Sequence, residues 1–331
     1  ESLLFQAVNR GKRSIALDLK DPEAIRAVRA LCRTADLVVE NFRPGVMDRL
    51  GVGFEDLKPL NPRLVYCAIS GFGQDGPLKK APAYDQIVQG MSGVMAVTGT
   101  PETAPLRVGY PMADTIGGMT AAFAVASALG NTDPNNRGCF IDVAMLEAVL
   151  STMGWVVSNY LQLGMEQQPM GNNNFTASPS GTFNTGDGPI NIAANKQEQF
   201  EAVCDVVGRP DLKTDPRFAE RQARLDNRPA LTELLEEAMA SNSADHWVEK
   251  LIAAGVPSGP GPAHVADSGP SADRGPGPDR DLQGCARRRP RRAGCPGGDQ
   301  DRPRTGGDGY AAAAVGPGHG RLAVRNGLFG G

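Results

Sequence analysis

Histidine is scarce in this chain of 331 residues, which carries only His246, His264 and His319. Chemistry that needs a histidine base, such as a Ser-His-Asp triad, therefore has few candidates, and carboxylate chemistry is favoured. The sequence also lacks a CxxC motif, and none of its six cysteines has a histidine at metal-ligand spacing. Neither a metal site nor a disulfide framework is indicated.

Several other signals are missing. Neither GxGxxG nor GxxxxGK[ST] follows a strand-like segment, so phosphate cradles of those kinds are unsupported. A net charge of −3 argues against a nucleic-acid partner. No apolar run reaches membrane-spanning length without interruption, and the first residues lack the order of a secretory signal. We therefore expect a cytoplasmic protein with no membrane partner.

Between residues 14 and 163 short apolar runs alternate with helical periodicity, which is typical of βαβ units. The pattern predicts an α/β domain with a largely parallel sheet over residues 1–168. The predicted strands cover 14–19, 36–40, 63–70 and 139–143, and the main helices cover 21–33, 85–94, 119–129 and 146–163.

A turn-rich connector at 171–181 leads to a segment of different character. A hairpin is predicted around residues 186–188, followed by helices at 197–207, 228–239 and 244–254. Residues 169–260 are thus interpreted as a smaller α+β domain.

Residues 261–331 form a third region, rich in Gly, Arg and Pro. It holds 17 of the 41 glycines and contains no Lys, Glu, Ile or Met, with a charge of +4 from 11 Arg and 7 Asp. Such composition predicts disorder. The basic run at 287–292 has no interleaved aromatic residues and is weak evidence for a nucleic-acid arm.

Asp114 lies between an extended segment that ends in Pro111 and the first turn of an apolar helix. Free N–H groups and the positive end of the helix dipole favour an anion there. One reading is a helix N-cap. The other is a catalytic carboxylate, because strand-to-helix junctions in open α/β folds face the ligand crevice.

Several motifs, spread over residues 4–260, resemble class III CoA-transferases. That family includes formyl-CoA and carnitine CoA-transferases and the α-methylacyl-CoA racemases. The stretches that carry the resemblance are RGKRSIALDLK (10–20), VENFRPG (39–45), NPRLVY (61–66), SGFG (70–73), PAYD (82–85) and AGVPSGP (254–260).

The resemblance implies a Rossmann-like large domain and an interlocked homodimer. The family begins with a βα unit that has no counterpart in this chain, so we expect the first strand and helix of the domain to be missing. Residues 261–331 do not match the family's C-terminal segment, and we interpret them as an out-of-frame tail.

By the same resemblance, Asp114 is the nucleophile of acyl transfer. It would form a mixed anhydride with an acyl-CoA and then an aspartyl-CoA thioester, which a small carboxylic acid resolves. Coenzyme A acts as substrate and carrier, and no other cofactor is implied.

The family's CoA-binding positions also carry over. Leu17, Asp18, Leu19 and Lys20 would line the adenine and phosphate end of CoA, and Asn41, Phe42, Arg43 and Arg49 would surround its nucleotide. Tyr84 would lie near the thiol arm, and Asp85 is a further CoA-binding position. Without the resemblance, the two arginines are solvated residues and Asn41 is a turn residue. Gly171, Asn172 and Gly181 would belong to a mobile connector over the active site, or simply to a flexible interdomain loop.

Tyr84 separates the branches of the family, because racemases carry a histidine at this position. Without an imidazole, proton exchange at the α-carbon lacks a partner of suitable pKa, so the sequence favours a transferase. A 2-methylacyl-CoA racemase and an inactive truncated and frameshifted fragment remain as alternatives. The sequence does not identify the acyl donor or acceptor.

Overall fold

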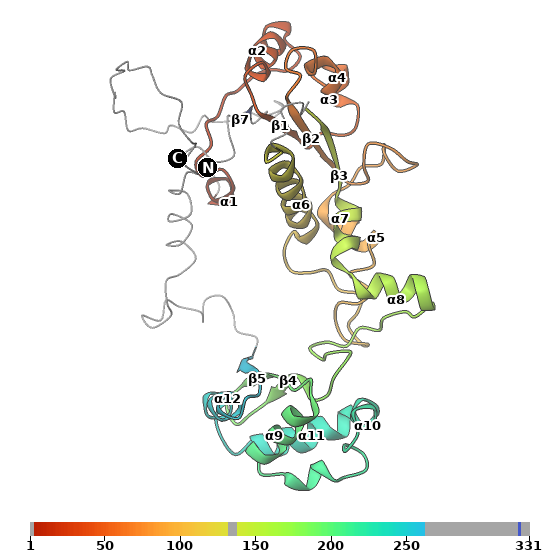
Figure 1. Cartoon of the computed structure of the whole chain (residues 1–331), viewed down its shortest axis with the longest axis vertical. Coiled ribbons are helices and arrows are strands. Elements are labelled where there is room, and N and C mark those ends of the chain that lie inside the picture. Colours follow the sequence, from red (N-terminus) through yellow and green to blue (C-terminus); the bar gives the residue numbers. More distant parts are fainter. Residues whose placement is uncertain (1–2, 132–137, 262–323, 326–331) are drawn as a thin grey trace, which may run out of the picture. The chain divides into compact units, whose positions relative to one another are not determined.

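The chain divides into two compact units (Figure 1) in a computed structural model that describes residues 3–131, 138–261 and 324–325. Unit 1 holds the described residues up to 96, together with 106–167 and 324–325, and unit 2 holds 97–105 and 168–261. Residues 97–105, which the sequence places in the large domain, group with unit 2. The tail predicted to be disordered lies almost wholly outside the described residues.

Unit 1 is built on a parallel sheet, as the sequence predicts. Strands β1 (Leu37–Glu40), β2 (Val65–Ser70) and β3 (Phe140–Ala144) are parallel, in the order β3-β2-β1, and β7 (Val324–Arg325) pairs antiparallel to β1. Helices lie between consecutive parallel strands, which confirms the α/β fold class.

Helices cover both faces of this sheet (Figure 1). One face packs against α2 (Pro22–Cys32), α3 (Val46–Arg49) and α4 (Phe54–Leu57), and the other against α6 (Met112–Leu129). Alternate strand residues point to opposite faces. Val38, Tyr66 and Ala68 therefore join the first core, and Leu37, Val65 and Cys67 join the second.

Two of the predicted elements are wrong. Residues 14–19 form no strand, because an extended segment becomes a strand only when a neighbour accepts its hydrogen bonds, and none pairs with it in the described structure. The apolar run at 146–163 forms two helices, α7 (Met145–Thr152) and α8 (Trp155–Leu163). They separate at Gly154, whose φ of 45° does not continue a right-handed helix.

Helix α6 is the one helix of the described residues that is long and apolar enough to cross a membrane, with a mean hydropathy of 1.3 over 18 residues. A single such helix is weak evidence for a span. Ala121 and Val125 are buried against β2 and β3, and Asp114 stands in its first turn. These contacts are those of a helix that packs on a sheet.

Unit 2 combines a small antiparallel sheet with helices. Strands β4 (Ser180–Asn184), β5 (Pro189–Ala193) and β6 (Ser258–Pro260) lie in chain order, which confirms the predicted hairpin. The sheet shares one core with α9 (Gln197–Val206), α11 (Arg228–Met239) and α12 (Ala244–Ala253). The remaining helices are α1 (Leu3–Val8) and α5 (Asp85–Met91) in unit 1, and the 3-10 helix η1 (Pro210–Lys213) and α10 (Arg221–Asp226) in unit 2.

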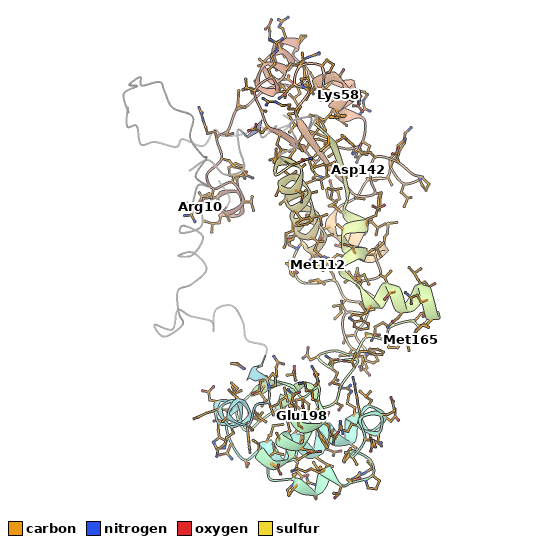
Figure 2. All side chains as sticks on the ribbon, in the orientation of Figure 1. Arg10, Lys58, Met112, Asp142, Met165 and Glu198 are labelled. Atoms are coloured by element: carbon orange, nitrogen blue, oxygen red, sulfur yellow. The ribbon has the colours of Figure 1, made fainter. Side chains whose placement is uncertain are left out.

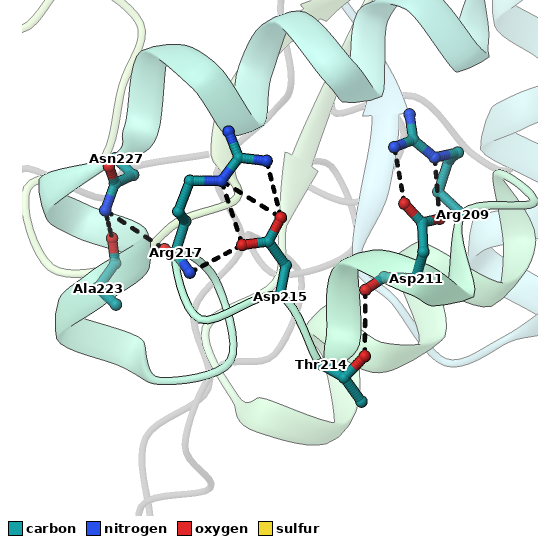
Figure 3. Close-up of polar contacts among 7 residues, drawn as sticks. All are labelled: Arg209, Asp211, Thr214, Asp215, Arg217, Ala223 and Asn227. Carbon is teal, nitrogen blue, oxygen red and sulfur yellow. Dashed lines mark hydrogen bonds and ion pairs between the residues drawn. The ribbon is translucent and has the colours of Figure 1, made fainter.

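The segment around η1 is held by exposed ion pairs (Figure 3). Arg209 donates to Asp211 at 2.8 and 2.9 Å, and Arg217 donates to Asp215 at 2.7 Å. Because these side chains are solvated, such pairs contribute little to stability. Their effect is to fix the local turns.

Candidate active site

A cavity of about 480 Å³ opens in unit 1 where the parallel strands end. We call it the Asp114 cavity. Its walls come from the residues after β1, from the end of β2 and from the start of α7, which is the usual position of a ligand site in an open α/β sheet. The lining is Asn41–Pro44, Ile69–Phe72, Lys79, Ala81–Tyr84, Asp114, Gly118 and Met145.

Asp114 is the third residue of α6 and projects from the helix's first turn. The N-cap is Pro111, which makes no side-chain cap bond, so the reading of Asp114 as an N-cap is wrong. Met112, labelled in Figure 2, begins the helix. The carboxylate is exposed and lines the cavity, close to the positive end of the helix dipole.

The pKa of Asp114 is raised above its ordinary value. Partial burial of the carboxyl is the larger cause, and the negative charge of Asp85 is the smaller. Higher basicity makes an ionised carboxylate a better nucleophile. The site thus combines exposure to the cavity with an environment that increases reactivity.

Asp85, predicted to be a CoA-binding residue, holds the start of α6. Its Oδ1 accepts the backbone N–H of Ala113 at 2.8 Å, and its Oδ2 accepts from Gln89 Nε2 at 2.8 Å and Arg107 Nη2 at 3.1 Å. The side chain is buried, and Gln89 is fully buried. Both carboxylate oxygens are engaged within the protein, so Asp85 positions the turn that carries Asp114.

Four other predicted residues share the Asp114 cavity. Asn41, Phe42 and Arg43 follow β1, and Tyr84 lies directly before α5 with 80% of its side chain exposed. Asn41 Nδ2 donates to the carbonyl of Ile69 at 2.7 Å, which ties the loop after β1 to the end of β2. The structure therefore brings these side chains to Asp114.

Arg49 lines a second cavity, of about 450 Å³, which we call the Arg49 cavity. It shares Pro44 and Lys79 with the Asp114 cavity and also includes Lys80. Neither Arg43 nor Arg49 forms an ion pair within the described residues. One wall is aromatic, made by Phe54, Tyr66 and Phe140.

Sequence reasoning missed Lys79 and Lys80. The signal for them was present, because they stand in the Gly- and Pro-rich loop after β2, where a parallel sheet exposes its ligand-binding edge. Together with Arg43 and Arg49 they form a border of four cations along the two cavities, and the Arg49 cavity is also lined by Glu40, Asp48 and Glu55.

Residues 17–20 line neither cavity. Leu19 is buried in the core beneath α2, and Leu17 packs against the same core. Asp18 Oδ1 accepts the backbone N–H of Lys20 at 3.0 Å and so closes a local turn. The leucines therefore have a packing role in this structure.

The connector residues Gly171, Asn172 and Gly181 line a separate hollow of about 360 Å³ in unit 2. Much of the connector is held in place. Arg228 donates to the carbonyls of Asn174 and Ala177 at 2.7 and 2.9 Å, and Arg224 donates to that of Ser178 at 3.0 Å. Before Asn174, the backbone N–H of Gly171 donates to the carbonyl of Gly99 at 2.6 Å. The mobility of the connector stays a prediction.

Glu40 ends β1 in the wall of the Arg49 cavity. Burial raises its pKa to about 7, and the charges of Asp48 and Asp142 add to the increase. A hydrogen bond from the backbone N–H of Phe42 to Oε2, at 2.6 Å, opposes it. The Glu40 carboxyl therefore holds the loop that carries Phe42 and Arg43. Its ionised form lowers the free energy of unfolding, because a buried charge is unfavourable.

This cost predicts a pH-dependent effect of Glu40→Gln. Because the pKa in the folded chain exceeds the ordinary value of 4.5, the free energy of unfolding falls as pH rises from about 4.5 to about 7. Glutamine keeps the acceptor for Phe42 without the charge. At pH 8 we expect the variant to be more stable by about 3 kcal/mol, and to lose this advantage below pH 4.5. Urea unfolding at both pH values measures it, and an equal difference at both would refute the role of charge.

Known proteins match this architecture. The family CoA-transferase family III matches residues 1–265. The acetyl-CoA:oxalate CoA-transferase of Acetobacter aceti is 44% identical over 262 residues, which cover 78% of this chain and 67% of that protein. The succinate–glutarate CoA-transferase of Agrobacterium fabrum is 37% identical, over 77% of this chain and 64% of the relative.

Solved structures of other proteins are similar to this chain in fold and sequence. A CaiB/BaiF family protein from Brucella suis has a TM-score of 0.73 and 37% identity, covering 86% of this chain and 73% of that protein. Rv3272 from Mycobacterium tuberculosis has a TM-score of 0.72 and 33% identity, covering 80% and 70%. The chain spans about two thirds of the length of the curated relatives it matches. With the fold, the order of the motifs and these matches in agreement, this chain belongs to CoA-transferase family III.

Proposed function

We propose that this chain is an acyl-CoA:carboxylate CoA-transferase and that Asp114 is its nucleophile. The observation that carries the proposal is the exposed carboxylate of Asp114 at the start of α6, in a cavity of about 480 Å³ at the ends of the parallel strands. A cavity of this size suits part of a small-molecule ligand.

The reaction balances without an added proton donor. An Asp114 oxygen attacks the thioester carbonyl of the donor, and the C–S bond breaks to release CoA thiolate and leave a mixed anhydride. The thiolate then attacks the Asp114 carbonyl carbon, releases the donor acid and forms an aspartyl-CoA thioester. An acceptor carboxylate attacks this thioester, and the released thiolate takes the acceptor's acyl group and frees Asp114.

The cations around the two cavities are suited to the phosphates of CoA. Arg43, Arg49, Lys79 and Lys80 line the adjoining cavities, and arginine forks bind phosphate oxygens in pairs. We assign the nucleotide of CoA to this border and the thioester to Asp114.

A small dicarboxylic acid is the acceptor class that the relatives suggest, since their names include oxalate and glutarate. Tyr84, exposed beside Asp114, is a phenol and offers no imidazole for proton exchange at an α-carbon. No histidine lies in the described part of unit 1. Both facts favour transfer over racemisation.

The proposal is tested by incubating the protein with acetyl-CoA and oxalate, or with succinyl-CoA and glutarate, and separating the CoA esters by chromatography. Formation of the acceptor's CoA ester, at a rate proportional to protein concentration, supports the function. A protein that folds and binds CoA but exchanges no acid with any donor would refute it.

Asp85→Asn should shift the pH dependence of transfer. Removing the charge of Asp85 removes one cause of the raised pKa of Asp114, so Asp114 remains ionised to lower pH. We therefore expect the acid limb of the rate profile to move to lower pH. The maximal rate should also fall, because the amide presents N–H groups to Gln89 and Arg107, which are themselves donors. Initial rates from pH 4 to 8 measure both effects, and an unmoved acid limb contradicts the charge argument.

We further propose that the chain forms a homodimer through apolar surface of unit 1. Helix α8 has no buried residue, and three of its large side chains are largely exposed. These are Tyr160, Leu161 and Leu163, at 56%, 75% and 72%. On α6, Phe123 is 77% exposed. Apolar patches of this kind mark protein interfaces.

Leu161→Asp should therefore weaken self-association. A charge at the centre of an apolar interface is costly to bury, and we expect the dimer dissociation constant to rise at least about tenfold. Sedimentation equilibrium measures it, with Gln162→Asp on the same helix as the control. Equal constants for the wild type and Leu161→Asp would remove α8 from the interface.

A further inference from the structure

Helix α6 carries two successive glycines one turn after Asp114, and they differ in their surroundings. A Cβ atom at Gly117 would lie 2.9 Å from Met145 Cγ, so this glycine allows α6 to approach α7. Apart from its chain neighbours and the backbone of its own helix, a Cβ atom at Gly118 would meet no atom of the described residues within 4 Å, and Gly118 is exposed. Packing therefore explains Gly117 but not Gly118.

Gly118 is also unfavourable for the helix itself. Glycine in a helix interior is less stable than alanine because it loses more backbone freedom on folding. An alanine would fit at this position without contact. A residue that breaks a local rule with no compensating contact points to a functional constraint.

The missing side chain lies beside the proposed nucleophile. Gly118 lines the Asp114 cavity, and residues four apart on a helix have Cβ atoms about 5–6 Å apart. Helical side chains lean toward the helix N-terminus, so a side chain at 118 would cover the turn that carries Asp114. Gly118 thus keeps the space next to the carboxylate open.

We propose that Gly118 determines the size of the acyl group that the protein accepts. The inference rests on the proposed function, in which both donor and acceptor acyl groups are bonded in turn to an oxygen of Asp114. An acyl group in that anhydride extends from the carboxylate into the Asp114 cavity, whose lining includes Gly118 and Met145. The class of ligand is an acyl group with a spacer longer than that of oxalate.

The test compares Gly118→Ala and Gly118→Leu with the wild type, using oxalate, succinate, glutarate and adipate as acceptors. Both variants should fold, because both residues favour helix over glycine and meet no atom at the Cβ position. For Gly118→Leu we expect kcat/KM with adipate, relative to oxalate, to fall by at least about tenfold, with alanine intermediate. Thr120→Leu, on another face of α6, should leave the ratios unchanged.

If the ratios of kcat/KM between acceptors are unchanged in Gly118→Leu, with or without an equal fall in every value, the inference is overturned. A wild type that uses oxalate and no longer acid would overturn it as well, because the open space would then hold no acyl spacer. A wild type that transfers CoA to no acid refutes the proposed function instead, and the inference falls with it. CoA binding, measured calorimetrically for each variant, separates a blocked acyl site from a lost nucleotide site.

Discussion

Asp114→Asn should lower the transfer rate by about a thousandfold or more, because the amide keeps the size of the side chain but lacks the nucleophilic oxygen anion. Asp114→Ala should have a similar effect. The affinity for CoA should change little, since the cations assigned to its phosphates lie on other elements. Steady-state rates and calorimetric binding of CoA measure the two properties separately.

The chain offers a matched control for this substitution. Glu147 is the third residue of α7, as Asp114 is of α6, and it is also exposed. It does not line the Asp114 cavity. Glu147→Gln should keep nearly full activity. Activity of Asp114→Ala comparable to that of Glu147→Gln would show that Asp114 is not the nucleophile.

Arg224→Met should destabilise unit 2 by about 3 kcal/mol or more. Arg224 is 3% exposed and donates to the carbonyls of Ser178, Phe218 and Ala219 at 3.0, 2.8 and 3.1 Å. Its guanidinium lies 4.2 Å from the centre of the Phe200 ring. Methionine restores the apolar stem but leaves three acceptors without their donor.

The measurement uses the two tryptophans of the chain. Trp247 is buried in the core of unit 2, whereas Trp155 is half exposed on α8 of unit 1. In a Trp155→Phe background, fluorescence during urea unfolding reports on unit 2. Arg217→Met removes an exposed pair with Asp215 and a contact of the guanidinium with the Phe218 ring at 4.8 Å, and should cost about 1 kcal/mol. Equal midpoints for Arg224→Met and Arg217→Met would mean that the buried arginine does not hold the connector.

Strands whose apolar residues follow one another along the chain could be predicted from the sequence alone. β1 and β2 are apolar on both faces, because helices cover both sides of the sheet, and their continuous apolar runs made them recognisable. Residues 14–19 carry a similar run but lack a partner strand among the described residues, which no local pattern reveals. The division at Gly154 depended on a single backbone dihedral.

The candidate site was predictable only in part. Asp114, Arg43 and Tyr84 were identified through motifs, and the structure brings all three to one cavity. The roles of Asp85 and Arg224 were not apparent, because a charged residue in a helix is normally solvated. Each becomes buried only through contacts with distant residues, such as Ala113 and Ser178.

The most direct test of the proposed mechanism is to follow the exchange of oxygen atoms between the acceptor and Asp114. If an acceptor carboxylate attacks the aspartyl thioester, one acceptor oxygen becomes the bridge of the anhydride and stays on Asp114 when CoA takes the acyl group. After turnover with an acceptor labelled with heavy oxygen in its carboxylates, mass spectrometry of the peptide that contains Asp114 should show incorporation of the label. Turnover that leaves this peptide unlabelled would contradict the account.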